Sequence, residues 1–435
     1  MKNAIVAFGC AALALAPVIV RAQNPTVPEG VRLGLNYTLG TKPGVLVLPM
    51  DSTGGDSVRA ILQRDIDYDD RANVVALDDA SAFGMMPKSG DKFNYPLFAK
   101  LGIVALLRPE RSMTGITITM YDVAARRRVQ VGSFPLLAKT NSPEWRLALH
   151  RASDEVERWI FGTPGSAATR IVYSGGDKQI WVTDSDGENA RRLTNVSLAM
   201  SPAWSPDGTK VVFSGFTPSG SQIAVYSFVT SDLHWLSGTA RGLNITPVYS
   251  PDGRSVAYAS GSDHGTDIMV MSVGDESPAR AITVGKGSDN TSPSYSPDGR
   301  QLAFMSGRAG HPEVYTMDAD GTNPTLLTEF TYGEQAYRAS PDWSSDGRRI
   351  AYESRIDGNF QIMTIDLRDR STKQYTSDGQ NEDPSWSPDA RHMVFSSTRS
   401  GPRQLWVIDA ESGRLRQLTH AAGARLPAWS PVFKP

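Results

Sequence analysis

The sequence predicts a two-domain protein, a small α/β domain followed by a six-bladed β-propeller. Three observations support this: a repeated motif after residue 200, unpaired strands at both ends of the repeat region, and alternating helix and strand patterns over residues 43–161. The motif is an aromatic residue followed by Ser-Pro-Asp-Gly or a close variant, and it recurs every 43 to 48 residues. That period is typical of four-stranded propeller blades. The aromatic residues are Trp204, Tyr249, Tyr295, Trp343, Trp386 and Trp429.

Each repeat reads as four antiparallel strands. The aromatic residue belongs to a short inner strand, and Ser-Pro-Asp-Gly forms a tight turn because proline presets its backbone angle and glycine tolerates a left-handed one. A β-rich run such as Val211–Ser214 follows, then a polar loop and a third strand that ends near an acid. An outer strand ends in Leu-Thr, as at Leu327-Thr328. Alternation and turn spacing both suit strands.

The ends of the repeat region predict how the ring closes. Residues 170–194 supply strands two to four of a blade without an inner strand, and Pro427–Trp429 supply an inner strand with nothing after it. We expect the two pieces to form the sixth blade, so the propeller spans residues 170–435. Such closure leaves only short, protected edges.

Residues 1–22 are predicted to be a secretory signal peptide. Lys2 precedes an apolar run from Ala4 to Val20, and the expected cleavage lies between Ala22 and Gln23. A membrane anchor is the alternative, but the run is short and contains Pro17. Cys10 is the only cysteine, so cleavage would leave a mature chain without disulfides or thiol chemistry. No other stretch is long and apolar enough to span a membrane, and we expect an exported protein.

Residues 23–42 form a predicted N-terminal arm. They are rich in proline and glycine, and Val31–Thr38 alternate apolar and polar residues. This segment suits either a flexible arm or the first strand of the next domain. As an arm, it could pair with the sheet edge of a partner. Its candidate contact residues are Val31, Leu33, Leu35 and Tyr37.

Residues 43–161 form the predicted α/β domain, and residues 162–169 the linker. The last helix has Ser142 as N-cap and Pro143 in its first turn. Its apolar residues from Trp145 to Trp159 repeat every three or four positions, which predicts one buried stripe. The other predicted elements are helices over Asp56–Tyr68 and Tyr95–Lys100, strands over Gly44–Pro49, Asn73–Leu77 and Gly102–Leu107, and a hairpin over Gly115–Tyr121 and Arg128–Gly132.

Enzyme signatures are scarce, so we expect no catalytic, cofactor-binding or metal-binding residues. There is no Gly-x-Ser-x-Gly elbow, and the six histidines lack ligand spacing. Two segments, Asp184–Gly187 and Asp318–Gly321, begin like calcium loops but lack the later ligands, so turn chemistry explains them better. A net charge of -2 and the short run Arg126–Arg128 argue against nucleic-acid binding.

The repeat predicts a binding face. In an antiparallel blade, the loops after the second strands share one face with the segments that lead into the inner strands, and these vary among repeats. Several carry arginine or histidine, which favours an acidic or hydrogen-bonding partner. The alternative is an ordinary solvated surface. The candidate residues of this propeller rim are Met200, Phe216, Thr246, His264, Thr291, Arg308, His311, Arg338, Arg355, Glu382, Arg403 and Arg425.

The chain resembles the TolB family, the periplasmic components of the Tol-Pal cell-envelope system. The resemblance rests on Ala199–Lys210, Ala152–Val156, Thr169–Tyr173 and the ending Leu426–Pro431, and on the order of signal peptide, α/β domain and six repeats. The stretch Asp51–Asp70 and the rim loops depart from the family pattern.

The resemblance implies a protein that is not an enzyme. It implies binding of the peptidoglycan-associated lipoprotein at the mouth of the propeller channel and of TolA through the N-terminal arm and α/β domain. The implied role is support of outer-membrane integrity and of constriction during cell division. Two alternatives stay open: an exported propeller enzyme, lyase-like or peptidase-related, and a glycan-binding propeller.

Overall fold

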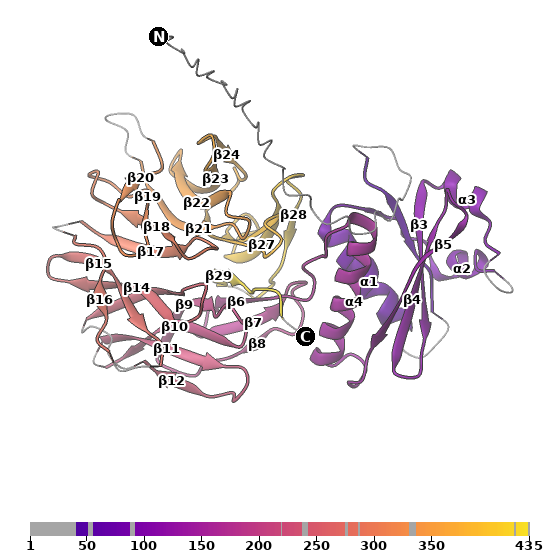
Figure 1. Ribbon diagram of the computed structural model, residues 1–435, viewed down its shortest axis with the longest axis horizontal. Helices are drawn as coiled ribbons and strands as arrows, with labels where there is room; N and C mark the ends of the chain where they lie inside the picture. The colour runs from indigo at the N-terminus through magenta and orange to yellow at the C-terminus, as the bar shows by residue number, and fades with distance from the viewer. Residues whose placement is uncertain are drawn as a thin grey trace, which may run out of the picture.

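The computed structural model describes residues 41–50, 55–87, 92–218, 220–236, 242–274, 277–285, 288–329, 336–421 and 423–433. Figure 1 shows an α/β domain beside a ring of small sheets, which confirms the predicted fold class. The signal peptide, its cleavage site at Ala22 and Gln23, and the arm residues Val31, Leu33, Leu35 and Tyr37 lie outside the described residues.

The α/β domain is built on a five-stranded mixed sheet with the order β2-β1-β3-β4-β5. The central strand β1 runs parallel to β2 and β3, whereas β3, β4 and β5 form an antiparallel meander. All four residues of β1 are buried because both faces of the sheet are covered. The strands are β1 (Gly44–Val47), β2 (Asn73–Val74), β3 (Ile103–Arg111), β4 (Gly115–Asp122) and β5 (Arg127–Pro135).

Helices cover the two faces of this sheet. The long helices α1 (Gly55–Asp69) and α4 (Pro143–Phe161) lie on the face toward the propeller (Figure 1). They pack on Val45 and Val47, whereas Leu46 and Leu48 point to the opposite face, as the period of two in a strand requires. The short helix α3 (Tyr95–Lys100) supplies Phe98 to that second core.

The caps of α4 follow the sequence prediction. The Ser142 hydroxyl accepts a hydrogen bond from the backbone N–H of Trp145 at 3.3 Å, which confirms Ser142 as the N-cap. The helix ends at Gly162, whose φ of 81° is the left-handed conformation that glycine adopts most readily.

Two details of this domain differ from the predicted elements. The strand expected over Asn73–Leu77 is limited to Asn73–Val74, although the Val75 N–H still donates to the Val45 carbonyl at 2.8 Å. A further helix, α2 (Asp79–Gly84), was not predicted; Asp78 caps it by accepting from the Ser81 N–H. At six residues, α2 is too short to show a helical repeat in the sequence.

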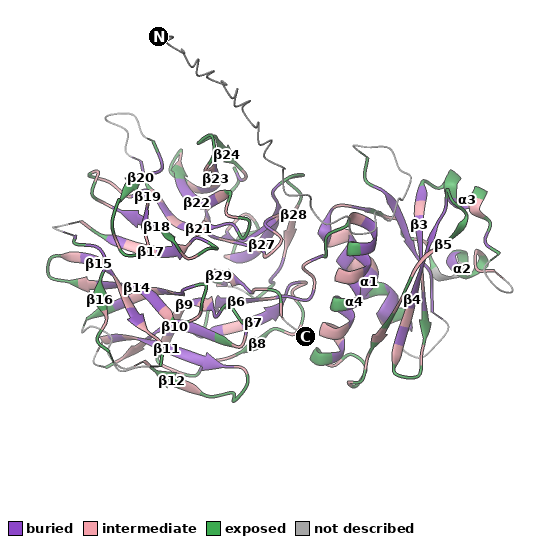
Figure 2. Cartoon of the chain, viewed as in Figure 1, coloured by how far each residue is buried: buried purple, intermediate pink, exposed green. Residues whose placement is uncertain are grey.

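Within the described residues, the propeller consists of six four-stranded antiparallel sheets. In Figure 2 buried residues follow the strands that face the centre of the ring and the neighbouring blades. The blades are, in chain order, β9 (Leu198–Trp204), β10 (Lys210–Thr217), β11 (Gly220–Ser227) and β12 (Leu233–Trp235); β13 (Leu243–Tyr249), β14 (Ser255–Ser262), β15 (Gly265–Ser272) and β16 (Arg280–Ala281); β17 (Asn290–Tyr295), β18 (Gln301–Ser306), β19 (Glu313–Asp318) and β20 (Thr325–Leu326); β21 (Arg338–Trp343), β22 (Arg349–Ile356), β23 (Asn359–Asp366) and β24 (Thr372–Gln374); β25 (Asn381–Trp386), β26 (His392–Ser397), β27 (Gln404–Asp409) and β28 (Leu415–Gln417); and β29 (Arg425–Trp429), β6 (Arg170–Ser174), β7 (Ile180–Asp184) and β8 (Arg191–Arg192).

The sixth blade joins the two ends of the propeller segment. Strand β29 pairs antiparallel with β6. The Arg170 N–H donates to the Ser430 hydroxyl at 2.9 Å, and the Ser430 N–H donates to the Arg170 carbonyl at 2.8 Å. The indole N–H of Trp429 donates to the Thr169 hydroxyl at 2.8 Å. Backbone pairing and one buried tryptophan therefore close the ring without a covalent bond.

The Ser-Pro-Asp-Gly turns behave as their chemistry predicts. In the first copy, Oδ1 of Asp207 accepts from the Ser205 hydroxyl at 2.5 Å and from the Thr209 N–H at 3.0 Å. Gly208 has a φ of 71° and lies 2.7 Å, measured from an ideal Cβ position, from the ring of Phe433. A side chain at this position would therefore meet both strain and a clash.

Replacing Trp429 should open the seam of the ring. Trp429→Ala removes a side chain that is only 7% exposed and leaves the Thr169 hydroxyl without its donor, so we expect the free energy of unfolding to fall by about 3–5 kcal/mol. Urea unfolding followed by circular dichroism measures this. Val432→Ala, at a neighbouring position that is 54% exposed, should change it by less than about 0.5 kcal/mol. Equal unfolding midpoints for the two variants would contradict the prediction.

Candidate binding face of the propeller

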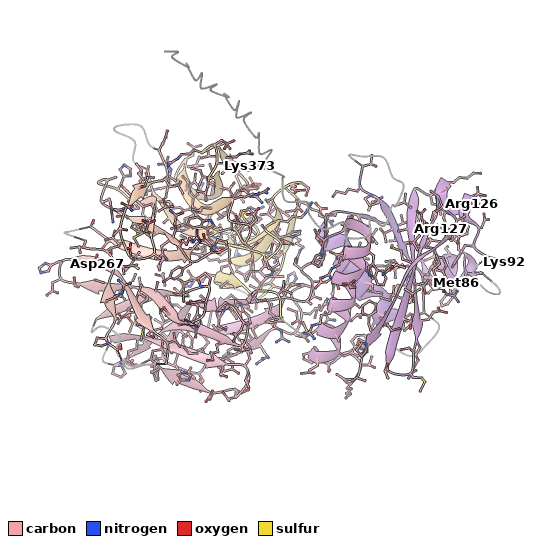
Figure 3. The ribbon with its side chains drawn as sticks, in the orientation of Figure 1. Met86, Lys92, Arg126, Arg127, Asp267 and Lys373 are labelled. Atoms are coloured by element: carbon pink, nitrogen blue, oxygen red, sulfur yellow. The ribbon has the colours of Figure 1, made fainter. Side chains whose placement is uncertain are left out.

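The two faces of the propeller differ in what covers them. The turns between first and second strands, and between third and fourth strands, share one face, and the α/β domain packs there. Its contacts include Asp186 in the β7–β8 turn and Arg414 in the β27–β28 turn. The opposite face carries the predicted rim loops, whereas Arg64 and Asp70 of the α/β domain also contact turns of the first face. In Figure 3 Asp267, near the start of β15 on the rim side, lies far from the α/β domain.

The predicted rim residues divide by exposure. Four of them are exposed: His264, Arg308, Arg355 and Arg425. The other eight are half-buried: Met200, Phe216, Thr246, Thr291, His311, Arg338, Glu382 and Arg403. All twelve lie in or beside the loops after the second strands or in the segments that lead into the inner strands. Their role in binding stays a prediction.

Ion pairs within the propeller neutralise part of the basic rim. Arg338 Nη1 lies 2.7 Å from Oε1 of Glu313, a fully buried carboxylate, and His311 Nδ1 lies 3.1 Å from the same oxygen. Arg403 forms an ion pair with Glu382. Among the described residues, no salt bridge involves Arg355 or Arg425. These two arginines are therefore the exposed cations best placed to meet a partner.

Arg308 has an additional structural role that the sequence analysis missed. Its guanidinium lies 5.0 Å from the centre of the Tyr315 ring and donates to Ser306 and to Oδ1 of Asn290 at 2.9 and 3.1 Å. In the fifth blade of the chain, Arg399 makes the same bonds to Ser397 and Asn381. Both arginines tie a loop to the segment that leads into the same blade. The sequence signal that could have revealed this structural role is the recurrence of Asn, Ser and Arg at equivalent positions in the two blades.

The inner strands surround a central channel with a cavity of about 150 Å³. One residue in each inner strand, always just before a proline, has a positive φ of 49–57°, although none is glycine. These positions coincide with a register shift against the second strand. Such backbone is uncommon for residues with a side chain and needs support from the surrounding structure. The residues are Ser201, Thr246, Ser292, Ser340, Asp383 and Leu426.

Two carboxylic acids, Asp342 and Asp383, line this channel, and Glu353 of β22 contacts the second of them. Oδ2 of Asp342 accepts from the Trp386 N–H at 2.7 Å, and Oε2 of Glu353 accepts from the Asp383 N–H at 2.9 Å. Burial raises the pKa of Asp342 to about 6, against the hydrogen bonds that favour its ionised form. Burial, followed by the charge of Asp383, raises the pKa of Glu353 above its ordinary value. The channel wall therefore holds acids that are costly to ionise.

One histidine and one turn that the sequence analysis weighed as metal ligands make other contacts in the structure. His311 pairs with Glu313, and Asp320 in the Asp318–Gly321 turn accepts from the Thr322 N–H at 2.9 Å, as turn chemistry requires. In the described part of the chain, the one cluster of histidine and acids close enough to share an ion is Asp65, His150 and Asp186, at the domain junction. The sequence analysis treated Asp186 as a turn residue and missed its burial there.

The distal basic residues belong to neither the rim nor the junction. Figure 3 places Arg126 and Arg127 at the end of the α/β domain that points away from the propeller. Both are exposed.

In the described residues, no helix is long and apolar enough to cross a membrane.

Comparisons with known proteins agree on one family. The model of the TolB beta propeller domain, PD40, matches residues 158–433. Two relatives named Tol-Pal system protein TolB, from Methylococcus capsulatus and Actinobacillus succinogenes, are 32% and 30% identical over 46% and 43% of this chain. The chain spans about half the length of these curated relatives, 49% and 46%. The crystal structure of TolB from Acinetobacter baumannii shares the fold, with a TM-score of 0.76 at 21% identity, covering 90% of this chain and 97% of that one.

Neutralising Asp342 should change how stability depends on pH. Because folding raises the pKa of Asp342 from 3.8 to about 6, the folded state binds more protons than the unfolded state between these values, and stability falls as pH rises through this window. Asp342→Asn removes that loss, so at pH 7 we expect a gain of at most about 3 kcal/mol.

Urea unfolding at pH values from 4 to 8 measures this effect. Asp342→Ala is the matched comparison, because it removes the charge and also the acceptor of the Trp386 N–H, and should be less stable than the Asn variant at every pH. If the Asn variant loses stability between pH 4 and 6 as steeply as the unmodified chain, Asp342 is not the group responsible.

Proposed function

Because the chain belongs to the TolB β-propeller family, we propose that it is a periplasmic, non-enzymatic binding scaffold of a Tol-Pal system. The names of the relatives support the system, and the segment before residue 23 supports export. The proposed role is support of outer-membrane integrity and of constriction during division. We propose that the chain acts as a monomer that joins two different partners.

The proposed partner of the propeller rim is the peptidoglycan-associated lipoprotein. The observation that carries this proposal is the free rim: the α/β domain packs on the opposite face, so variable loops on a rigid ring stay open. Arg355 and Arg425 are exposed there. Tyr337 and Phe360 pack edge to face beside Arg355, with ring centres 5.2 Å apart, and Tyr337 is 37% exposed. Aromatic and arginine side chains are the residue types that most often dominate protein interfaces.

The proposed partner of the N-terminal arm is TolA. Lys42, close to the first described residue, lies at the domain junction, where its Nζ is 2.6 Å from Oδ1 of Asp70. Asp70 also contacts Ser412 and Arg414 of the propeller. This junction lies on the face opposite the rim, which supports a second partner site separate from the rim.

Reversing the two exposed rim charges should weaken lipoprotein binding. We expect Arg355→Glu combined with Arg425→Glu to raise the Kd at least about tenfold, because like charges would face an acidic partner. Titration calorimetry against the periplasmic domain of the organism's lipoprotein measures this. Arg300→Glu is the control, since Arg300 lies in a turn on the opposite face with its side chain 86% exposed.

The outcomes separate the parts of this proposal. Weaker binding of the double variant with unchanged binding of the Arg300 variant supports both function and location. Unchanged binding of both variants would keep the function but reject this rim position. Failure of the folded, unmodified chain to bind the lipoprotein would reject the scaffold function.

Removing residues 23–40 should abolish TolA binding and leave lipoprotein binding intact. The deletion spares Lys42 and its ion pair with Asp70, so the described fold is preserved. Binding of purified TolA periplasmic domain is measured with the deleted and the full mature chain. Equal TolA affinity for the two chains would place that contact elsewhere.

A further inference from the structure

The two domains meet at a buried carboxylate of the propeller, Asp186. Its side chain is 1% exposed and lies between helices α1 and α4. Arg146 of α4 donates to Oδ2 of Asp186 at 2.6 Å, and Arg64 of α1 forms a second ion pair with the same oxygen. His150 Nε2 is 3.5 Å from that oxygen. One turn of the sixth blade is therefore held by three side chains of the other domain.

His150 connects Asp186 to α1. Its imidazole is completely buried, and its Nδ1 is 2.8 Å from Oδ2 of Asp65. The Ser153 hydroxyl donates to the same Asp65 oxygen at 2.6 Å. The ring thus lies between two carboxylates, one from each domain, with one nitrogen toward each.

The geometry suits the protonated ring. A neutral imidazole has only one N–H. If Nδ1–H donates to Asp65, the lone pair of Nε2 points toward the Asp186 carboxylate, and Nε2 makes no hydrogen bond within the described residues. Protonation turns Nε2 into a second donor and gives both carboxylates an opposite charge. A metal ion fits less well, because Arg64 and Arg146 already occupy Asp186.

The charged groups around the ring come from three sides. Helix α1 contributes Arg64 and Asp65, and α4 contributes Arg146 and the buried Asp154, whose pKa is raised to about 7 by burial. The propeller contributes Asp184, Asp186 and the half-buried Arg416, whose guanidinium donates to the Ser185 carbonyl at 3.1 Å. Burial lowers the pKa of His150, but Asp65, then Asp186 and Asp184, outweigh it, and the net direction is upward. The arginines lie on Asp186 and limit the rise without reversing it.

We propose that His150 is a proton-linked latch between the two domains: its imidazolium joins Asp65 of α1 to Asp186 of the propeller, and loss of the proton loosens this contact. Because folding raises the pKa of His150, the stabilisation is complete below about pH 6.5 and is lost as pH rises through the folded-state pKa. The proposal concerns how the domains are held together and does not depend on which partners bind.

A second contact does not titrate in this range and acts as the pivot. Arg414 Nη2 is 2.7 Å from Oδ2 of Asp67, and its Nη1 is 3.4 Å from Oδ1 of Asp70. Arginine keeps its charge throughout this range, and the hydrogen bond to Asp67 raises the pKa of Arg414 further. Deprotonation of His150 therefore weakens the contact at Asp186, where Arg64 and Arg146 keep their charge, and the α/β domain gains freedom to move about the Arg414 contact.

The first test is a histidine titration by NMR on the mature chain labelled with ¹³C-histidine. The His150 signal is assigned by its absence in His150→Gln. We expect it to titrate above pH 6.5, and Asp186→Asn to lower its midpoint by about one unit. Asp320→Asn is the matched control, because Asp320 occupies the same place in the β19–β20 turn but is exposed. A midpoint at or below 6.5, or one that Asp186→Asn leaves unchanged, would overturn the proposal.

The second test measures the domains themselves. Fluorescent labels at Met113→Cys and Val284→Cys, both highly exposed and in different domains, report the interdomain distance by energy transfer, with Cys10→Ser where the chain retains that residue. We expect transfer to change between pH 5 and 10 with the midpoint of His150, and the change to vanish in His150→Gln. His420→Gln, an exposed histidine, should keep it. A change that persists in His150→Gln, or a constant transfer in the unmodified chain, would overturn the proposal.

Discussion

Burial of apolar side chains between neighbouring blades is the interaction on which the propeller depends. A four-stranded blade has two faces and cannot cover both alone. Val212 and Val225 of one blade share a core with Tyr249 and Tyr258 of the next, and similar cores recur around the ring. Burial of this kind contributes about 25 cal/mol for each Å² of apolar surface removed from water. Because each blade relies on two neighbours, the ring is stable only when it is closed.

This dependence explains why the fold was largely predictable. The inner-strand aromatic residues and the turn residues recur because every blade needs the same packing contacts and the same tight turn. Their period is therefore visible in a single sequence. Ser142 and Gly162 were predictable as caps because a cap depends on a few adjacent residues. Helix α2 and the short strand β2 were harder, since neither is long enough to establish a period.

The polar contacts of the rim and the junction were not predictable for a different reason. Glu313 and Arg338 are 25 residues apart in the sequence, and Arg146 and Asp186 are 40 residues apart. A local sequence pattern therefore cannot predict either ion pair. Asp186 and Asp320 occupy equivalent turns with almost the same local sequence, yet one is buried against α4 and the other is exposed. The position of the neighbouring domain decides the difference. The left-handed residues before the inner-strand prolines were equally hidden, because Ser, Thr, Asp and Leu do not indicate that backbone.

The seam between β29 and β6 has a mechanical consequence. The linker after α4 enters the propeller at Arg170, the first residue of β6. This strand also pairs with β29, through Ala428 and Trp429. A pull on the α/β domain is therefore transmitted first to the blade that closes the ring. Several hydrogen bonds between adjacent strands then bear the load together, in shear, with the Trp429 indole anchored on Thr169 beside them. Tension between the two domains would thus fall on the strand pair where the two ends of the propeller segment meet.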